Sequence, residues 1–224
     1  MHKIYALETP HYIINDIDPI DISANVKEVK NIFNQLTYSH IPVKKGDEYM
    51  GCVSETDAHC FDASKVLDDY AYAFEPFHVK YGTNWLEVIG AFADNATNIM
   101  PVLDESNHYL GYYELADMMN LFNKTPFLNE SGTVLVVEKK TRENSFSEIT
   151  QIVESNNAKI LGVFISAMDM EKTETTLKVS TENLNALLQN FRRYDYQIVS
   201  AHLEDQAEES LKKRSKYLNK YLNI

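Results

Sequence analysis

Ser54 and Asp57 lie three residues apart and are the side chains of this sequence best suited to bind a ligand. If Ser54 caps a helix, the backbone N–H groups of the first turn point outward and the helix dipole adds partial positive charge. Both features favour a phosphate. A carboxylate one turn further on can accept hydrogen bonds from both hydroxyls of a ribose. The spacing is also close to that of a capping box, in which the acidic residue only stabilises the helix end. The pair therefore predicts either a nucleotide site or a structural cap.

The surrounding segment, residues 51–57, returns in altered form at residues 111–117. In both copies a glycine opens a short apolar strand and an aspartate ends the segment, so Asp117 corresponds to Asp57. The serine is replaced by Glu114, which places a negative charge where a phosphate would lie. Like charges about 4 Å apart cost on the order of 1 kcal/mol in water and several when partly desolvated. We therefore expect the second site to favour a neutral adenosine moiety over a polyphosphate.

The duplication extends over the N-terminal half of the chain. A shift of 59 residues aligns Asn25 with Asn84 and Pro42 with Pro101, and a shift of 60 aligns the glycines and aspartates of the two segments. Each copy reads helix, strand, turn, strand, helix: apolar residues recur at helical spacing after the asparagine, and a strand lies on either side of a turn. Matching asparagines, prolines, glycines and aspartates in one order indicate an internal repeat.

An apolar strand around each proline completes the predicted site. Such a strand offers an apolar surface against which the face of an adenine ring can lie. The candidate binding residues are Ser54, Thr56, Asp57, Ile41, Pro42 and Val43 in the first copy, and Met100, Pro101, Val102 and Asp117 in the second.

Two tandem units with an apolar-Pro-Val strand followed by Gly-x-x-Ser/Thr-x-x-Asp resemble a pair of CBS domains, the Bateman module, over about residues 15–122. The resemblance implies a regulatory module that binds an adenine nucleotide such as AMP, ADP or ATP and associates into a disk-like dimer. It assigns the aspartate to the ribose, the hydroxyl to the phosphate and the apolar strand to the base. Glu114 departs from this family pattern in the second unit.

The pattern changes after a linker-like stretch at residues 123–132. A β-branched strand, a helix that begins with a capping box from Ser145 to Glu148, two strands, a second helix and a last strand follow. The order is βαββαβ, the ferredoxin-like arrangement. This half is similar to an ACT-type regulatory domain. Asn144 stands where that family usually has a glycine before the first helix, which argues against the close approach of an amino-acid ligand to the backbone.

The expected fold class is therefore α+β, with two tandem CBS units of helix, strand, strand and helix and one βαββαβ domain. We expect the CBS pair to cover residues 1–126, the first 21 of them irregular, and the ACT-like domain to cover residues 131–204. Residues 205–224 are predicted to form a charged helix with leucines on one side. That helix either binds a partner or a second copy, or lies over its own domain. The layout is similar to that of acetoin-utilisation (AcuB-type) CBS–ACT proteins.

Composition argues against several other classes of function. The net charge of −12 argues against a surface for duplex nucleic acid, because Lys and Arg supply most of the non-specific affinity for phosphates. No apolar run approaches the ~18 residues of a membrane span, and the first residues lack the apolar core of a signal peptide. Cys52 and Cys60 are too few for a disulfide framework and are expected to be reduced thiols, with the cytoplasm as the compartment.

The sequence shows no set of catalytic residues. The seven histidines have no metal-ligand spacing, and no serine elbow, P-loop or Gly-x-Gly-x-x-Gly motif occurs. We therefore expect no catalysis and no bound metal, and we predict a regulatory or sensor protein in which nucleotide binding changes the geometry of a homodimer. One alternative, which Glu114 favours, is an interaction scaffold with degenerate pockets. Another, an enzyme that uses the carboxylates of Glu55 and Asp57, lacks a base paired with a nucleophile.

Overall fold

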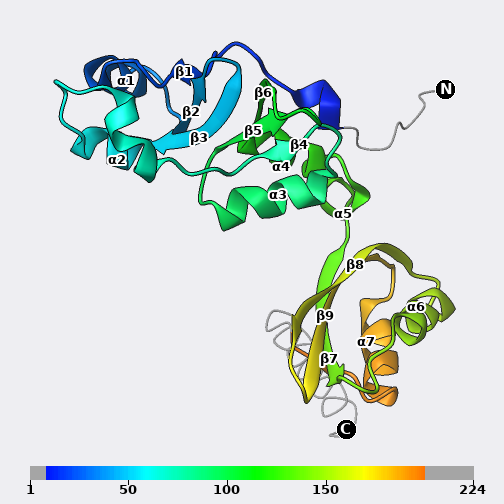
Figure 1. Ribbon diagram of the computed structural model, residues 1–224. Coiled ribbons are helices and arrows are strands. Elements are labelled where there is room, and N and C mark those ends of the chain that lie inside the picture. The colour runs from blue at the N-terminus through cyan, green and yellow to red at the C-terminus, as the bar shows by residue number, and fades with distance from the viewer. Residues whose placement is uncertain (1–8, 200–224) are drawn as a thin grey trace, which may run out of the picture. The chain divides into compact units, whose positions relative to one another are not determined.

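The computed structural model of the protein describes residues 9–199. The chain divides into two compact units, and the division falls between Phe122 and Asn123. The N-terminal unit carries two three-stranded sheets and the C-terminal unit one four-stranded sheet, each with helices (Figure 1). The predicted α+β class is confirmed. Within residues 9–199, no helix is both long enough and apolar enough to cross a lipid bilayer.

The first repeat of the N-terminal unit follows the predicted order. Its elements are β1 (Ile20–Asp21), α1 (Val26–Phe33), β2 (His40–Lys45), β3 (Glu48–Ser54) and α2 (Glu55–Cys60). Asn25 caps α1 as predicted, because its Oδ1 accepts a hydrogen bond of 2.8 Å from the N–H of Lys27. Strands β2 and β3 pair antiparallel, and β1 adds to β2 in parallel.

The second repeat has the same elements in the same order. They are β4 (Val79–Lys80), α3 (Trp85–Asp94), β5 (Ile99–Leu103), β6 (Tyr109–Glu114) and α4 (Leu115–Asn123). Asn84 caps α3 through the N–H of Leu86, at 2.9 Å. The strand order β4-β5-β6 matches β1-β2-β3, and a 3₁₀ segment, η2 (Leu67–Ala73), lies between the repeats. The repeat in the sequence is therefore also a repeat of structure.

Each repeat completes the sheet of the other. Ile14, ahead of the first repeat, exchanges two backbone hydrogen bonds of 2.9 and 2.8 Å with Tyr112 of β6. Glu75, ahead of the second repeat, exchanges two of 2.8 Å with Cys52 of β3. The N-terminal residues expected to be irregular thus include a short 3₁₀ helix, η1 (Thr9–Tyr12), the strand β1 and this bridge. Elements this short leave no periodic pattern in a sequence, so the expectation missed them.

This exchange explains the matched glycines of the two repeats. Gly51 and Gly111 have φ angles of 126° and 142°, which residues with a side chain rarely adopt. A Cβ at Gly51 would lie 2.9 Å from the carbonyl oxygen of Glu75, and one at Gly111 would collide with that of Ile14. Glycine is therefore needed at both positions for its backbone conformation and for the close approach of the crossing chain.

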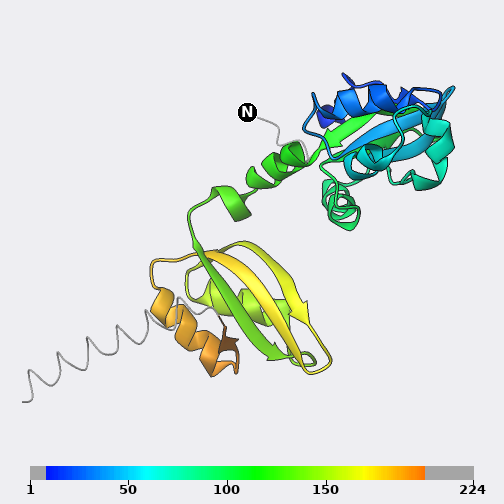
Figure 2. The same cartoon turned by 90° about the vertical axis from the view of Figure 1, so that its left-hand side faces the viewer.

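The C-terminal unit has the predicted order βαββαβ. Its elements are α5 (Pro126–Asn129), β7 (Thr133–Lys140), α6 (Phe146–Ser155), β8 (Lys159–Met168), β9 (Lys172–Ser180), α7 (Leu184–Arg193) and β10 (Gln197–Ile198). The sheet is antiparallel with the order β10-β7-β9-β8. Helices α6 and α7 cover one of its faces, and a core that includes Leu135, Ile149, Leu177 and Phe191 lies between (Figure 2). The helix predicted at residues 205–224 lies outside the described residues.

The capping box predicted at the start of α6 is wrong. Ser145 is the N-cap residue of α6, but its side chain makes no capping hydrogen bond. Glu148 instead accepts a hydrogen bond of 2.7 Å from Nζ of Lys139, on β7. That bond lowers the pKa of the Glu148 carboxyl. Lys139 on β7 therefore binds the Glu148 carboxylate, which the local pattern had predicted to cap the helix.

Candidate functional site

Ser54 and Asp57 lie together where β3 runs into α2. Ser54 is the N-cap residue of α2: its Oγ accepts a hydrogen bond of 3.1 Å from the N–H of Asp57 and donates one of 2.9 Å to Oδ2 of Asp57. Both residues are half-buried, and among the described residues only Ser54 bonds to this carboxylate. The predicted pair is thus brought together, and the other carboxylate oxygen can still accept a hydrogen bond from a ligand.

The first turn of α2 has fewer free amides than the sequence suggested. The N–H of Glu55 donates to the carbonyl of Ser39 at 2.9 Å, and the N–H of Asp57 donates to Ser54. The exposed Thr56 is left with the one first-turn N–H that has no acceptor in residues 9–199. Helix α2 is also only six residues long and carries two acidic residues in its first turn. The attraction for a phosphate is therefore weak here, and the Asp57 carboxylate is the stronger binding group.

Glu114, the equivalent of Ser54, has a partner from the other repeat. Tyr38, which precedes β2, donates its phenol proton to Oε1 of Glu114 at 2.5 Å, and its Oη lies 3.0 Å from that of Tyr112. Tyr112 in turn donates to Oδ1 of Asp16 at 2.7 Å. Burial is the largest cause that raises the pKa of both Tyr38 and Tyr112. Both phenols therefore keep their protons and act as donors.

Asp117 lies in the first turn of α4 and is half-buried. Its carboxylate forms no hydrogen bond with any residue of the range 9–199, unlike that of Asp57. The second site thus combines an unbonded carboxylate with a glutamate that is already bonded to a phenol.

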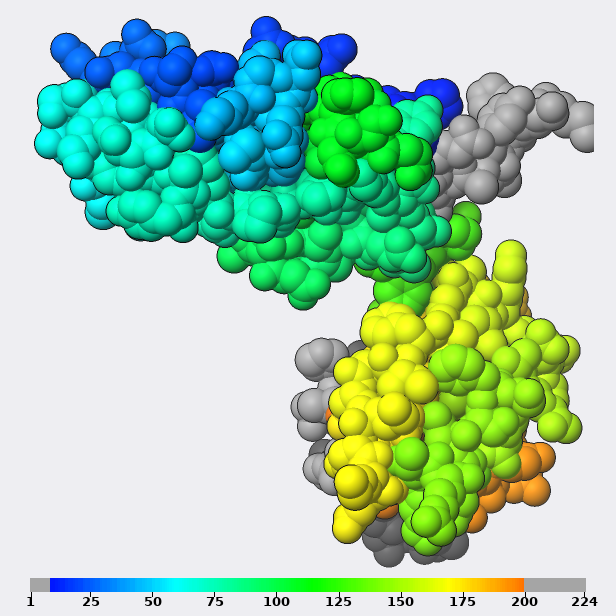
Figure 3. All heavy atoms as spheres, in the orientation of Figure 1, coloured from blue at the N-terminus to red at the C-terminus, as the bar shows by residue number. Residues whose placement is uncertain are grey.

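The two repeats meet through equivalent residues, Ser39 and Asn98. The N–H of Ser39 donates to Oδ1 of Asn98 at 2.8 Å, and the N–H of Asn98 donates to Oγ of Ser39 at 3.1 Å. Reciprocal contacts of this kind are what a two-fold relation produces. Figure 3 shows the first repeat, blue to cyan, packed directly against the green second repeat. This contact brings Tyr38 of one repeat to the helix start of the other.

The predicted base-binding strands place their side chains on two faces. Ile41 and Val43 belong to the core of the first repeat, and Met100 and Val102 to that of the second. Successive side chains of a strand alternate, so the proline between each pair points to the opposite face. Pro42 and Pro101 are themselves buried, and the four neighbouring side chains belong to the cores. All six predicted base-binding residues of the two strands are therefore covered in this structure.

The structure adds three residues that sequence reasoning missed: Tyr38, Tyr112 and Asp16. Tyr112 lies within the repeated segment 111–117 but has no role in its pattern, and Tyr38 is 76 residues from its partner Glu114 in the chain. A comparison of the repeats position by position would have found that Tyr38 corresponds to Thr97 and Glu114 to Ser54. An aromatic residue and a charged residue in one pairing thus correspond to two small hydroxyl residues in the other.

The two thiols of the N-terminal unit differ in environment, which predicts a difference in reactivity. Cys52 is buried, and burial raises its pKa to about 12, whereas Cys60 is exposed. Because the thiolate is the reactive form, a thiol reagent should modify one cysteine in the native protein and two after denaturation. A reagent that releases a chromophore for each modified thiol counts the reactive cysteines by absorbance. Cys60→Ser should abolish the reaction of the native protein. Rapid modification of that variant would contradict the burial of Cys52.

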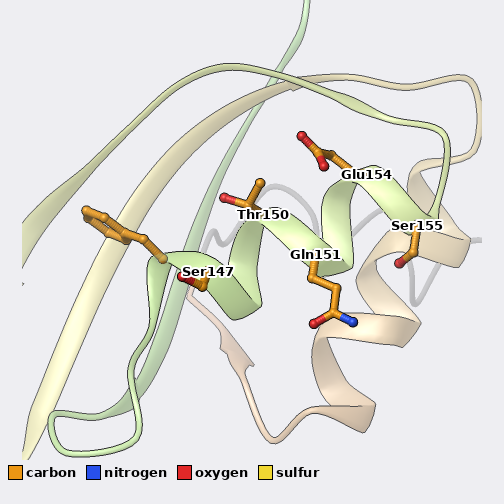
Figure 4. A pocket seen from close by; sticks show the side chains of 6 residues that line it. Ser147, Thr150, Gln151, Glu154 and Ser155 are labelled. Carbon is orange, nitrogen blue, oxygen red and sulfur yellow. The ribbon is translucent and has the colours of Figure 1, made fainter.

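A hollow of the C-terminal unit lies away from both predicted sites. It has a volume of about 650 Å³ and is lined by Phe146, Ser147, Thr150, Gln151, Glu154 and Ser155. All of these side chains project from α6 (Figure 4), so no other element encloses a ligand there. The described residues also contain no group of three or more His, Cys, Asp or Glu side chains that could hold a metal ion.

No family model matches the chain, and no curated protein matches it. Several solved structures resemble about half of it. A CBS domain pair/ACT domain protein from Thermotoga maritima covers 51% of this chain and 95% of its own, with 19% identity and a TM-score of 0.46. The CBS domains of a transcriptional regulator from Streptococcus pneumoniae cover 50% and 97%, with 19% identity and a TM-score of 0.45. CBSX2 in complex with AMP covers 50% and 93%, with 16% identity and a TM-score of 0.44. These structural neighbours contain CBS domains.

Proposed function

We propose that residues 1–126 form a regulatory CBS pair that binds an adenine nucleotide in its first repeat. The observation that carries this proposal is the Asp57 carboxylate, half-buried at the start of α2 and bonded only to the Ser54 hydroxyl among the described residues. One of its oxygens is left for a ribose. The base would lie on the face of β2 that carries Pro42, once the groups that bury this proline move aside.

The free amides of α2 also indicate which part of the nucleotide matters most. Among the described residues, Thr56 alone has a first-turn N–H without an acceptor, so a phosphate gains little there. Hydrogen bonds from ribose hydroxyls to the Asp57 carboxylate are charge-assisted and stronger. AMP, ADP and ATP should therefore bind with similar affinity, because they share the ribose and the base.

Asp57→Asn should weaken the binding of AMP at least tenfold. A hydrogen bond to a charged group contributes about 1.5–3 kcal/mol, and the amide replaces the charge while its oxygen can still accept from Ser54. Calorimetric titration of the full chain with AMP, ADP and ATP measures the change. Asp117→Asn is the matched control in the second repeat and should leave this affinity unchanged. Wild-type affinity in a folded Asp57→Asn protein would remove Asp57 from the site.

A second candidate function is an interaction scaffold that binds no small molecule. The bond between Tyr38 and Glu114 favours it, because a protein side chain already holds the group that a ligand would meet in the second repeat. If the melting temperature of the protein stays unchanged across a panel of adenine nucleotides and adenosine, the result supports the scaffold function over nucleotide binding.

We propose that the chain acts as a homodimer and that its second repeat forms the contact. Leu86 on α3 is 59% exposed, and Gly90 one turn later has open space around it. The equivalent residues on α1 are Lys27 and Asn31, so the fold does not itself require an apolar outer face at this helix. A nucleotide can then alter the dimer only by binding one arrangement more tightly than the other.

Leu86→Lys introduces the residue found at the equivalent position of α1 and should shift the dimer to monomer at micromolar concentration. A buried apolar contact would be replaced by a charge that must be desolvated. Sedimentation equilibrium of wild type and variant measures the association, and Lys27→Gln on α1 serves as the control. Equal association of wild type and Leu86→Lys would place the contact elsewhere.

We further propose that the C-terminal unit, residues 131–204, is an ACT-like domain of ferredoxin-like topology. Its support is the order βαββαβ with the antiparallel strand order β10-β7-β9-β8. The free thiols of Cys52 and Cys60 support a cytoplasmic location, since thiols stay reduced there. The hydroxyl–carboxylate pair at α2 supports a binding role and not catalysis.

A further inference from the structure

We infer that Tyr38 fills the second nucleotide site from within the chain, so that one nucleotide binds per chain, in the first repeat. The second site is defined here as Glu114, Asp117 and the start of α4. This inference rests on the proposed function of the first repeat. It adds to that proposal the residue, Tyr38, that prevents a nucleotide from binding in the second repeat.

The contacts of Tyr38 carry the inference. Its phenol donates to Glu114 at 2.5 Å, lies 3.0 Å from Oη of Tyr112, and its ring meets that of Tyr112 edge to face at 5.6 Å between centroids. Tyr112 is fully buried and is fixed in turn by Asp16. Tyr38 is thus held by two partners of the second repeat, at the position where a ligand would contact Glu114.

The first repeat provides the internal comparison. Under the shifts of 59 and 60 residues that relate the repeats, Tyr38 corresponds to Thr97, Glu114 to Ser54 and Tyr112 to Cys52. The bridges Ile14–Tyr112 and Glu75–Cys52 make Ile14 equivalent to Glu75, and so Asp16 to Phe77. None of these four can form the same chain of phenols and carboxylates. Thr97 is short and donates its hydroxyl proton to the carbonyl of Ile99 at 2.8 Å. Among residues 9–199, Ser54 therefore has no partner equivalent to Tyr38.

The charges of the second site decide which ligand could replace Tyr38. Glu114 accepts a hydrogen bond from Tyr38 and Asp16 accepts one from Tyr112, and Asp117 follows one turn into α4. A phosphate brought to this place meets these carboxylates. With Tyr38 removed alone, the site should accept adenosine and still reject AMP. With Glu114 also replaced, it should accept AMP.

The experiment exchanges residues between the repeats. Tyr38→Thr combined with Glu114→Ser gives the second site the residues of the first. Tyr38→Thr alone removes the phenol that fills the second site and leaves Glu114 in place. Calorimetric titration of the full chain with AMP should give one site in wild type and two in the double variant. Titration with adenosine should give one additional site in Tyr38→Thr. Circular dichroism and thermal melting establish that each variant is folded.

Adding Asp57→Asn separates this inference from the proposed function. If wild type binds no AMP and the double variant binds one, the proposed first site is wrong, whereas the part of the inference in which Tyr38 blocks the second site stands. If wild type binds one AMP and both folded variants gain no site, the inference is overturned. Two sites in the wild type would overturn it as well. When Asp57→Asn is added to the double variant, the protein should still bind one AMP, in the second repeat. Asp57→Asn alone, with the second repeat unchanged, should bind no AMP.

Discussion

Replacing Gly111 with alanine should destabilise the N-terminal unit by about 3 kcal/mol or more. The new Cβ would collide with the carbonyl oxygen of Ile14, and φ at this position is 142°. Backbone strain of this kind and overpacking each cost on the order of 1–3 kcal/mol. The bridge between Ile14 and Tyr112 must then open or shift. Urea unfolding followed by fluorescence measures the loss, because Trp85 is the single tryptophan of the chain and lies in this unit.

Gly46→Ala is the matched control for this prediction. Gly46 also has a positive φ, of 63°, but a Cβ there meets nothing within 4 Å. Its substitution should therefore cost only the strain of a left-handed residue, about 1–2 kcal/mol. If Gly46→Ala and Gly111→Ala destabilise equally, the N-terminal segment does not cross β6 as the structure has it.

Leu177→Ala should destabilise the C-terminal unit by about 2–5 kcal/mol, the range for a leucine removed from a packed core. Leu177 is fully buried in β9 and belongs to the core beneath α6 and α7. Because the cores of the two units share no residues, the unfolding of the N-terminal unit should stay unchanged. Circular dichroism should show an earlier transition, while the fluorescence of Trp85 unfolds at the wild-type urea concentration.

Thr176→Ala tests the same strand on its other face. Thr176 is half-buried next to Leu177 and points away from the helices, so its loss should change stability by well under the loss for Leu177→Ala. A shift of the Trp85 transition in Leu177→Ala would show that the two units unfold as one, and would contradict the separation of their cores.

Much of the fold could be predicted because its signals are local. The N-caps Asn25 and Asn84 act on amides two residues away, and helical or strand periodicity needs only a few neighbours. Local patterns fail where a distant group competes. The capping box at Ser145 was plausible by spacing, but Lys139 on a neighbouring strand bonds Glu148 more strongly than a backbone amide would, because both groups are charged.

The local contacts of the candidate site could be predicted from the sequence, and its long-range contacts could not. Ser54 and Asp57 meet because they are one helical turn apart, a relation fixed by helix geometry. That the amide of Glu55 is already bonded to Ser39 could not be read from spacing, since the acceptor comes from the strand before the turn. The number of free donors at the helix end, and so the attraction for phosphate, depends on that pairing.

The sequence by itself determined the duplication, the order of the elements and the hydroxyl–carboxylate pair of the first repeat. The tertiary structure alone decided that Ile14 pairs with the second repeat and that Tyr38 reaches Glu114. The physical reason is distance along the chain. Contacts between residues 76 positions apart arise from the packing of one repeat against the other, and that packing leaves no periodic trace in either repeat.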